Sequence, residues 1–255
     1  MTKAVVPDAN SGIYVIDLSN YDAVYYPLET SSAPVFAAVS ADGMTAYVTG
    51  TNTGSVYVVN LASGSVINTF PLSMGMIYGI TLNAQGDAAY VAVYGGGWGS
   101  TVVEIDVATG TVLATLTAAG GPETMTLAPD GQSLLVATQY NGLVVLNLSD
   151  SSLNETVPMD QDLRHVAINA AGTLAVATSN ADGTVTLVDF NPALVARPAV
   201  VTTPDAQLAN TGQSPLQNVI PVFALVLLLV LAGLAVFGIR HSLQSAANAS
   251  ARSAR

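Results

Sequence analysis

The sequence lacks cysteine altogether and has little histidine. Disulfide bonds, thiolate metal sites and a thiol nucleophile are therefore excluded. His165 is the one histidine before residue 219, so the sequence predicts no zinc site in that part of the chain. No Gly-x-Ser-x-Gly elbow occurs either, which removes support for a serine nucleophile. We expect no catalytic residue, no metal and no cofactor.

Basic residues are also scarce, with 6 Lys and Arg against 17 Asp and Glu. Residues 1–207 hold all 17 acidic residues and only three basic ones, which leaves a formal charge of −14. Nucleic-acid binding needs clustered Lys and Arg, so we expect no nucleic-acid partner. Such acidity keeps a domain soluble, and recruitment of a cation is the alternative interpretation.

Charged residues are absent from residues 219–239, an apolar run long enough for a helix that crosses a bilayer. The tail that follows, residues 240–255, carries Arg240, Arg252 and Arg255. Because positive charge favours the cytoplasmic side, we expect a transmembrane helix with the tail in the cytoplasm and the bulk of the chain outside.

An export signal is missing at the other end. Residues 1–7 contain Lys3 but no apolar segment of the kind found in signal peptides. We therefore expect that the N-terminus is truncated.

A repeat governs residues 1–198. Turn glycines recur at spacings of 43, 45 and 41 residues, namely Gly43, Gly86, Gly131 and Gly172. Strand-ending Asp or Asn residues recur at spacings of 43, 46, 41 and 42, namely Asp17, Asn60, Asp106, Asn147 and Asp189. Such periods mark propeller blades or similar arrays.

Short segments rich in Val, Ile, Thr and Tyr lie between these landmarks and predict strands joined by tight turns. Four strands per period give one blade, so the predicted fold class is all-β, a β-propeller of about five four-stranded blades. The predicted blades are residues 1–34, 35–76, 77–121, 122–162 and 163–198. The first blade is incomplete, because residues 3–6 align with 45–48 and its innermost strand is missing.

The best repeat copy resembles a known family, the YVTN-type β-propeller repeat of bacterial and archaeal surface proteins. The match is carried by Asp42-Gly43, then Ala46-Tyr47-Val48-Thr49, then Val56-Tyr57-Val58-Val59-Asn60, then Gly64-Ser65-Val66-Ile67-Asn68-Thr69. It continues more loosely at residues 84–117, 129–157 and 170–190. Related propellers commonly have seven blades, which agrees with missing upstream blades. The alternative is a five-bladed ring in which residues 197–202 complete the first blade.

A second resemblance lies in the linker, residues 199–218. Leu208, Ala209, Asn210, Thr211 and Gly212 resemble the LAXTG pentapeptide of Gram-positive cell-wall sorting signals, the form associated with class E sortases of actinobacteria. In that family a transient sortase cleaves the bond that here joins Thr211 and Gly212. It then transfers the threonine to an amine of peptidoglycan or a pilus. The pentapeptide, apolar run and basic tail occur in the family's order.

Two other interpretations of this end remain open. One is a plain single-span anchor at residues 219–239 that carries the pentapeptide by chance. The other is a lipid-anchor signal, although such tails end within the apolar run and lack a basic stop.

The glycine-rich stretch at residues 95–99 holds the only tryptophan, Trp98, directly after Tyr94. A phosphate loop would lead into a helix and carry Lys or Ser/Thr at fixed places, and neither condition holds. A flexible loop between strands is one interpretation. A binding loop for sugar or peptide, with Trp98 and Tyr94 as contacts, is the other.

Acidic side chains recur at two kinds of position. The strand-ending Asp and Asn residues predict Asx capping of turns rather than a carboxylate ring. Asp160, Asp162, Arg164 and His165 form a separate cluster, which predicts a solvated loop with a local ion pair in preference to an acid–base or metal site.

Together these features predict a non-catalytic interaction or scaffold module at the cell surface or cell wall, with a surface ligand that the sequence does not identify. Two alternatives remain. A lactonase-like enzyme would bring several acidic or His side chains together around a divalent ion. A surface-layer or adhesion protein would differ only in its partner.

Overall fold

Tight turns around Asp, Asn and Gly divide the chain into short antiparallel strands. The computed structural model describes residues 3–29, 31–95, 99–159, 162–181, 183–190 and 200–201. The chain divides into two units, Met1–Gly212 and Gln213–Arg255, and every described residue belongs to the first.

The described part of the chain is all-β apart from one short 3-10 helix, η2 (Ser151–Leu153). The strands of the first and second sheets are β1 (Lys3–Asp8), β2 (Gly12–Asp17), β3 (Ala23–Pro27), β4 (Pro34–Val39), β5 (Thr45–Gly50), β6 (Ser55–Asn60) and β7 (Val66–Pro71). Those of the third and fourth are β8 (Met76–Leu82), β9 (Ala88–Tyr94), β10 (Thr101–Asp106), β11 (Val112–Thr117), β12 (Pro122–Leu127), β13 (Ser133–Thr138), β14 (Gly142–Asn147) and β15 (Glu155–Val157). The fifth sheet contains β16 (Leu163–Ile168), β17 (Leu174–Ser179), β18 (Val185–Asp189) and β19 (Val200–Val201).

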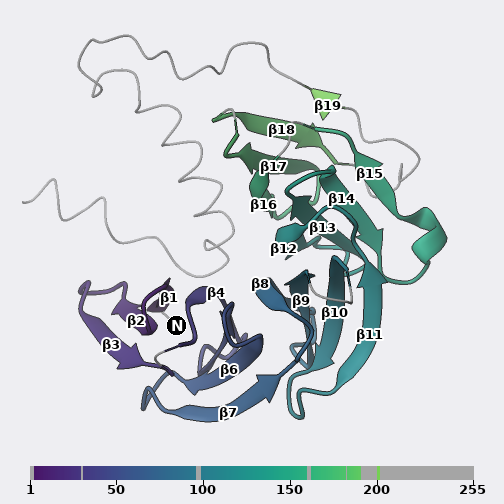
Figure 1. Ribbon diagram of the computed structural model, residues 1–255. Helices are drawn as coiled ribbons and strands as arrows, with labels where there is room; N and C mark the ends of the chain where they lie inside the picture. The colour runs from purple at the N-terminus through teal and green to yellow at the C-terminus, as the bar shows by residue number, and fades with distance from the viewer. Residues whose placement is uncertain are drawn as a thin grey trace, which may run out of the picture. The chain divides into compact units, whose positions relative to one another are not determined.

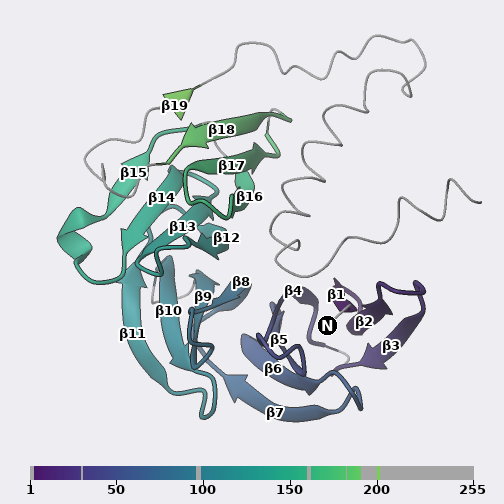
Figure 2. The same cartoon turned by 180° about the vertical axis from the view of Figure 1, so that it is seen from behind.

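These strands form five small sheets, each with its strands in chain order. The first sheet has three described strands and the other four have four. β4, β8, β12 and β16, the first strands of successive sheets, contact one another in sequence and gather toward a common centre (Figure 1), and the reverse view shows the same order (Figure 2). This arrangement is a β-propeller-like fold, as the repeat predicts.

The first sheet corresponds to the second, third and fourth strands of the others. β2 reads Gly-Ile-Tyr-Val-Ile-Asp and β6 reads Ser-Val-Tyr-Val-Val-Asn, each beginning opposite the last residue of the preceding strand. β1 therefore occupies the place of β5, in agreement with the alignment of residues 3–6 with 45–48.

The last strand, β19, lies beyond the predicted boundary at residue 198. It pairs antiparallel with β18, with Leu187 opposite Val201 and Val188 opposite Val200. The expectation that residues 197–202 could complete the first blade is therefore wrong for Val200 and Val201. These residues add the outer strand of the fifth sheet instead.

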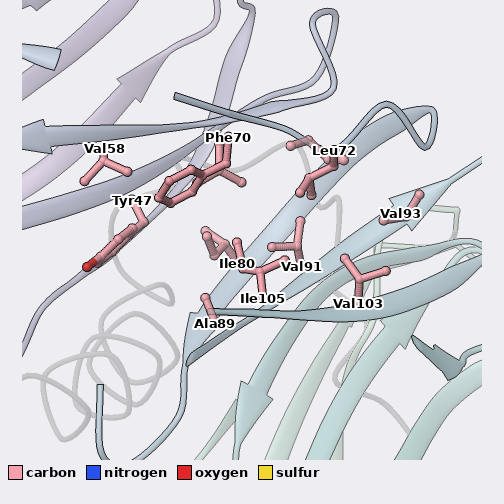
Figure 3. Packing of buried hydrophobic residues seen from close by; sticks show 12 residues of the cluster. Tyr47, Val58, Phe70, Leu72, Ile80, Ala89, Val91, Val93, Val103 and Ile105 are labelled. Atoms are coloured by element: carbon pink, nitrogen blue, oxygen red, sulfur yellow. The ribbon is translucent and has the colours of Figure 1, made fainter. Parts of the chain in front are cut away.

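In the described part of the chain the core consists of four hydrophobic clusters, one between each pair of successive sheets. In Figure 3, Tyr47 and Phe70 of the second sheet lie against Ile80, Val91 and Ile105 of the third. Alternate residues of a central strand pack to opposite sides: Val58 joins this cluster, whereas Val59 packs toward the first sheet. Burial on both faces explains why these strands are almost continuously apolar.

The turns between strands use the predicted Asx chemistry. The side-chain oxygen Oδ1 of Asn60 accepts from the backbone N–H of Ala62 at 2.9 Å and of Ser63 at 3.0 Å. Asp17, Asp106 and Asn147 accept equivalent bonds after their own strands. The four predicted turn glycines all have positive φ, between 66° and 78°, which glycine adopts without strain. The prediction of capping rather than a carboxylate ring is confirmed at these four Asp and Asn positions.

Within the described ranges, no helix is long and apolar enough to span a membrane. Three predicted segments lie outside those ranges: the span at residues 219–239, the basic tail at 240–255, and the linker at 199–218 except for residues 200 and 201.

Candidate functional site

A recurring irregularity marks the start of the innermost strand in four sheets. The register with the neighbouring strand shifts between Pro34 and Phe36, Ile77 and Ile80, Pro122 and Thr124, and Leu163 and His165. The residues within these bulges are Val35 in the second sheet, then Tyr78 and Gly79, Glu123, and Arg164. Because a bulge re-aims the side chain that it carries, the last three sheets present an aromatic, an acidic and a basic residue at equivalent places.

The bulged backbones pack closely against one another. A side chain on Gly79 would meet the backbone oxygen of Glu123 at 2.7 Å, so only glycine permits this approach of β8 to β12. The hydroxyl of Thr124 donates to the backbone oxygen of Arg164 at 2.8 Å and joins β12 to β16. The three bulges are thus held at fixed positions by strand-to-strand contacts.

Glu123 and Arg164 form the centre of a group of polar side chains joined by ion pairs and hydrogen bonds. Glu123 is only 4% exposed, and Arg164 Nη1 lies 3.0 Å from its Oε1. Gln139 Nε2 donates to the same oxygen, and Arg164 Nη2 lies 2.9 Å from Asp162 Oδ1. A buried carboxylate with an Arg and an amide partner avoids the desolvation cost of an unpaired charge.

Asp162 connects this polar group to Asn180, in the turn that follows β17. Asp162 has φ 64°, its N–H donates to the Gln139 backbone oxygen at 2.6 Å, and Asn180 Nδ2 donates to its Oδ2 at 3.2 Å. Positive φ is uncommon for a non-glycine residue, although Asp adopts it more readily than most. Backbone and side-chain bonds together fix the carboxylate beside Arg164.

Three tyrosines lie next to the polar group. The Tyr78 and Tyr94 rings meet nearly at right angles, 82° apart with centroids 6.2 Å apart, and the Tyr94 and Tyr140 hydroxyls are 3.4 Å apart. A side chain on Gly121 would meet the Tyr94 ring at 2.8 Å and the Tyr140 ring at 3.4 Å, so both rings lie over this glycine. Tyr140 is 58% exposed.

The protonation of these phenols follows from their surroundings. Burial raises the pKa of Tyr78, and the Glu123 charge raises it further, whereas Arg164 opposes this. The hydrogen bond with Tyr140 is the largest cause of the raised pKa of Tyr94. Both hydroxyls therefore stay protonated at neutral pH and can act as donors or acceptors.

These side chains come from the same edge of three sheets, because the start of an innermost strand lies beside the end of the strand antiparallel to it. We call them the rim cluster: Tyr78, Tyr94, Glu123, Gln139, Tyr140, Asp162, Arg164 and Asn180.

A further aromatic contact lies beside the rim cluster. His165 follows Arg164 on β16, and its ring packs edge-on against Phe36 of β4 with centroids 6.1 Å apart. β4 and β16 belong to the second and fifth sheets, so this contact joins sheets that are not neighbours in the chain.

The predicted site residues have different outcomes. Tyr94 lies in the rim cluster. The local ion pair predicted around Asp162 and Arg164 is confirmed. The predicted solvated loop is wrong for Arg164 and His165, which lie in β16, where Arg164 also pairs with the buried Glu123. Trp98 and Asp160 lie outside the described residues, as do Leu208, Ala209, Asn210, Thr211 and Gly212 of the predicted sorting motif. The sugar or peptide role of Trp98 and the sorting role of Thr211 stay predictions.

The sequence did not single out five residues of the rim cluster, namely Tyr78, Glu123, Gln139, Tyr140 and Asn180. One signal could have identified two of them. Tyr78 and Glu123 occupy the repeat position that holds apolar Val35 in the best-matching copy, so they depart from the repeat pattern.

In chemical terms the rim cluster is suited to binding. Its charged groups are already paired, and its tyrosines supply ring faces and hydroxyls. Across the described part of the chain, no group of three or more His, Asp or Glu side chains gathers in a way that could hold a metal ion.

Comparisons with known proteins identify the fold and no family. No protein-family model matches the sequence, and no curated protein matches it. Among solved structures, 1356 chains match, so the fold is too widely shared to select one function. Hydrazine synthase from Kuenenia stuttgartiensis is similar with a TM-score of 0.65 and 18% sequence identity, over 74% of this chain. The match covers 60% of that protein, and at this identity it supports the β-propeller-like fold alone.

Proposed function

We propose that this chain is a cell-surface β-propeller that acts as a non-catalytic interaction module and is linked to the cell wall through Thr211. The observation that carries the anchoring is the order of three segments: the pentapeptide at residues 208–212, the apolar run at 219–239 and the arginines of the tail. The run and tail hold the chain in the membrane while the pentapeptide stays outside.

The anchoring step is a transpeptidation. The sortase thiolate attacks the carbonyl carbon of Thr211, the bond to Gly212 breaks, and the Gly212 amine leaves with a proton. An amine of peptidoglycan or a pilus then attacks the thioester, forms an amide with Thr211 and releases the thiol. The step needs neither oxidant nor reductant.

The rim cluster supports the role as an interaction module. It combines a partly exposed guanidinium on β16 with an exposed phenol and amide groups on the turns that follow β13 and β17. Preorganised groups of this kind lower the entropy lost when a ligand binds.

The anchoring is tested in the source bacterium by replacing Thr211 with Ala. We expect Thr211→Ala to abolish the wall-linked form and to leave the chain in the membrane fraction. Mass spectrometry of muralytic digests should find, for the parent chain, a C-terminal peptide that ends at Thr211 and carries a wall fragment.

Asn210→Ala is the matched control, because the third position of the motif is variable, and it should leave wall attachment intact. Wall-linked protein that extends past Gly212, or undiminished attachment of the Thr211→Ala chain, would contradict the proposal.

A further inference from the structure

We infer that the rim cluster is a binding site for neutral saccharides. This inference rests on the proposed role as an interaction module and adds the class of ligand. Three observations carry it: the arrangement of the tyrosine rings, the planar polar groups beside them, and the charge of the site and its domain.

The tyrosine rings provide the apolar part of the site. Tyr140 is exposed, and its hydroxyl contacts that of Tyr94, whose ring stands against Tyr78. One side of a sugar ring presents C–H groups that pack on the face of an aromatic ring, while the hydroxyls point outward at its edge. Tyrosine suits this role because it offers a rigid ring and a polar tip.

The polar groups provide the hydrogen bonds. Arg164 is 39% exposed in its side chain and uses two of its nitrogens on Glu123 and Asp162. Its five N–H donors exceed these contacts, and Asp162 and Asn180 add further acceptors and donors. Guanidinium, carboxylate and amide groups are planar and can bond two adjacent sugar hydroxyls at once.

Electrostatics limits the ligand to saccharides without negative charge. Glu123 and Asp162 outweigh Arg164 by one charge, and residues 1–207 carry −14. An acidic sugar would meet repulsion from the domain and compete with carboxylates already bound to Arg164.

The layout of the site favours a compact ring over a peptide. The rim cluster joins the edges of three sheets and does not follow one strand, whereas peptide strands bind along a sheet edge or groove. Each group is fixed from the protein side: Glu123 by Gln139 and Arg164, and Asp162 by Asn180.

The experiment uses the full chain in a detergent that has no sugar head group, so that the detergent cannot compete. Isothermal titration calorimetry is run with chitotetraose, cellotetraose and maltotetraose as neutral probes, tetragalacturonate as the acidic probe and tetralysine as the peptide probe. We expect at least one neutral probe to bind with a Kd on the order of 0.1–1 mM.

Tyr140→Ala should weaken that binding about tenfold or more, because it removes the exposed ring. Tyr140→Phe keeps the ring and should weaken it by about threefold or less. Tyr14→Ala is the matched control, since Tyr14 is an exposed tyrosine of the first sheet, and should leave the Kd unchanged. Circular dichroism verifies that each variant is folded.

Binding of tetragalacturonate or tetralysine without a neutral probe would overturn the inference. So would an absence of binding to all three neutral probes, or neutral binding that Tyr140→Ala leaves unaltered. The wall-attachment experiment is independent of the binding experiment. A chain that binds saccharide but is never found linked to the wall would refute the proposed anchoring, and the ligand assignment would still stand.

Discussion

Two tyrosines at the same place in the repeat have opposite surroundings. Tyr57 is the third residue of β6, is 3% exposed and packs between the first and second sheets. Its hydroxyl donates to Glu29 and lies 3.0 Å from the Thr53 hydroxyl. Tyr14 is the third residue of β2 and is 40% exposed. Val6 and Tyr25 lie opposite Tyr14 on the neighbouring strands and are also exposed. The face of the first sheet that carries Tyr14 is therefore exposed to solvent, whereas the corresponding face of the second sheet is buried.

This pair gives a prediction for single residues. Tyr57→Ala should lower the free energy of unfolding by about 3–4 kcal/mol, because it empties a packed site and removes the hydrogen bond to Glu29. Tyr14→Ala should lower it by less than about 1 kcal/mol, since no core surrounds the ring. Urea denaturation followed by circular dichroism measures both, and equal losses would contradict the assignment of the exposed face.

At the scale of elements, the Asx turns show that Asp and Asn serve the same purpose in different sheets. Asp106 ends β10, and its side chain accepts hydrogen bonds from Ala108 and Thr109. Asn60 and Asn147 accept equivalent bonds from the residues that follow them at the ends of β6 and β14. The side-chain hydrogen bond from Thr109 is the largest cause of the lowered pKa of Asp106, followed by the Thr109 backbone N–H. The aspartates differ from the asparagines only in being able to titrate.

Acid should therefore weaken the Asp turns and spare the Asn turns. A folded pKa below the ordinary 3.8 means that the unfolded chain binds the proton more tightly. The stability from Asp106 is then present above that ordinary value and is lost as pH falls through the lowered folded pKa.

Asp106→Asn should change Tm at pH 7 by less than about 2 °C, because asparagine accepts the same bonds. The variant should also lose less stability than the parent between pH 5 and pH 2. Thermal melts at both pH values test this, with Asp22→Asn as the control, since the Asp22 carboxylate accepts from the side chain of Asn20 and, within the described residues, from no backbone N–H. Identical acid losses in Asp106→Asn and parent would refute the role of this turn.

The elements were predictable from sequence to a large extent because their signals are local. Strand periodicity, Asx residues and turn glycines act within a few residues, and the five sheets follow from their recurrence. The bulges were not predictable, because one extra residue breaks the alternation that assigns side chains to faces. Tyr94 could be named as a contact, but its partner Tyr140 lies in another repeat and becomes a neighbour only when the sheets pack.

At the scale of the whole molecule, the acidic excess is the dominant property. With a formal charge of −11 over the whole chain, like charges repel in the folded state more than in the expanded unfolded state. Composition alone could predict this, whereas the rim cluster required the positions of three sheets.

Screening should therefore stabilise the protein. Raising NaCl from 10 to 200 mM at pH 7 should raise Tm by about 2–4 °C, because the Debye length shortens and repulsion weakens. The same increase at pH 4, where part of the carboxylates are neutral, should have a smaller effect. Differential scanning calorimetry measures both, and a salt effect that is larger at pH 4 would contradict the explanation.

The contact between Phe36 and His165 has a consequence for the order of folding. In repeat proteins each unit contacts its neighbours, so structure can spread from one repeat to the next. Phe36 and His165 instead close a loop of roughly 130 residues, at an entropic cost of about 4 kcal/mol. We therefore expect this contact to form only after the intervening third and fourth sheets have shortened the loop, and then to couple the unfolding of the second sheet to that of the fifth.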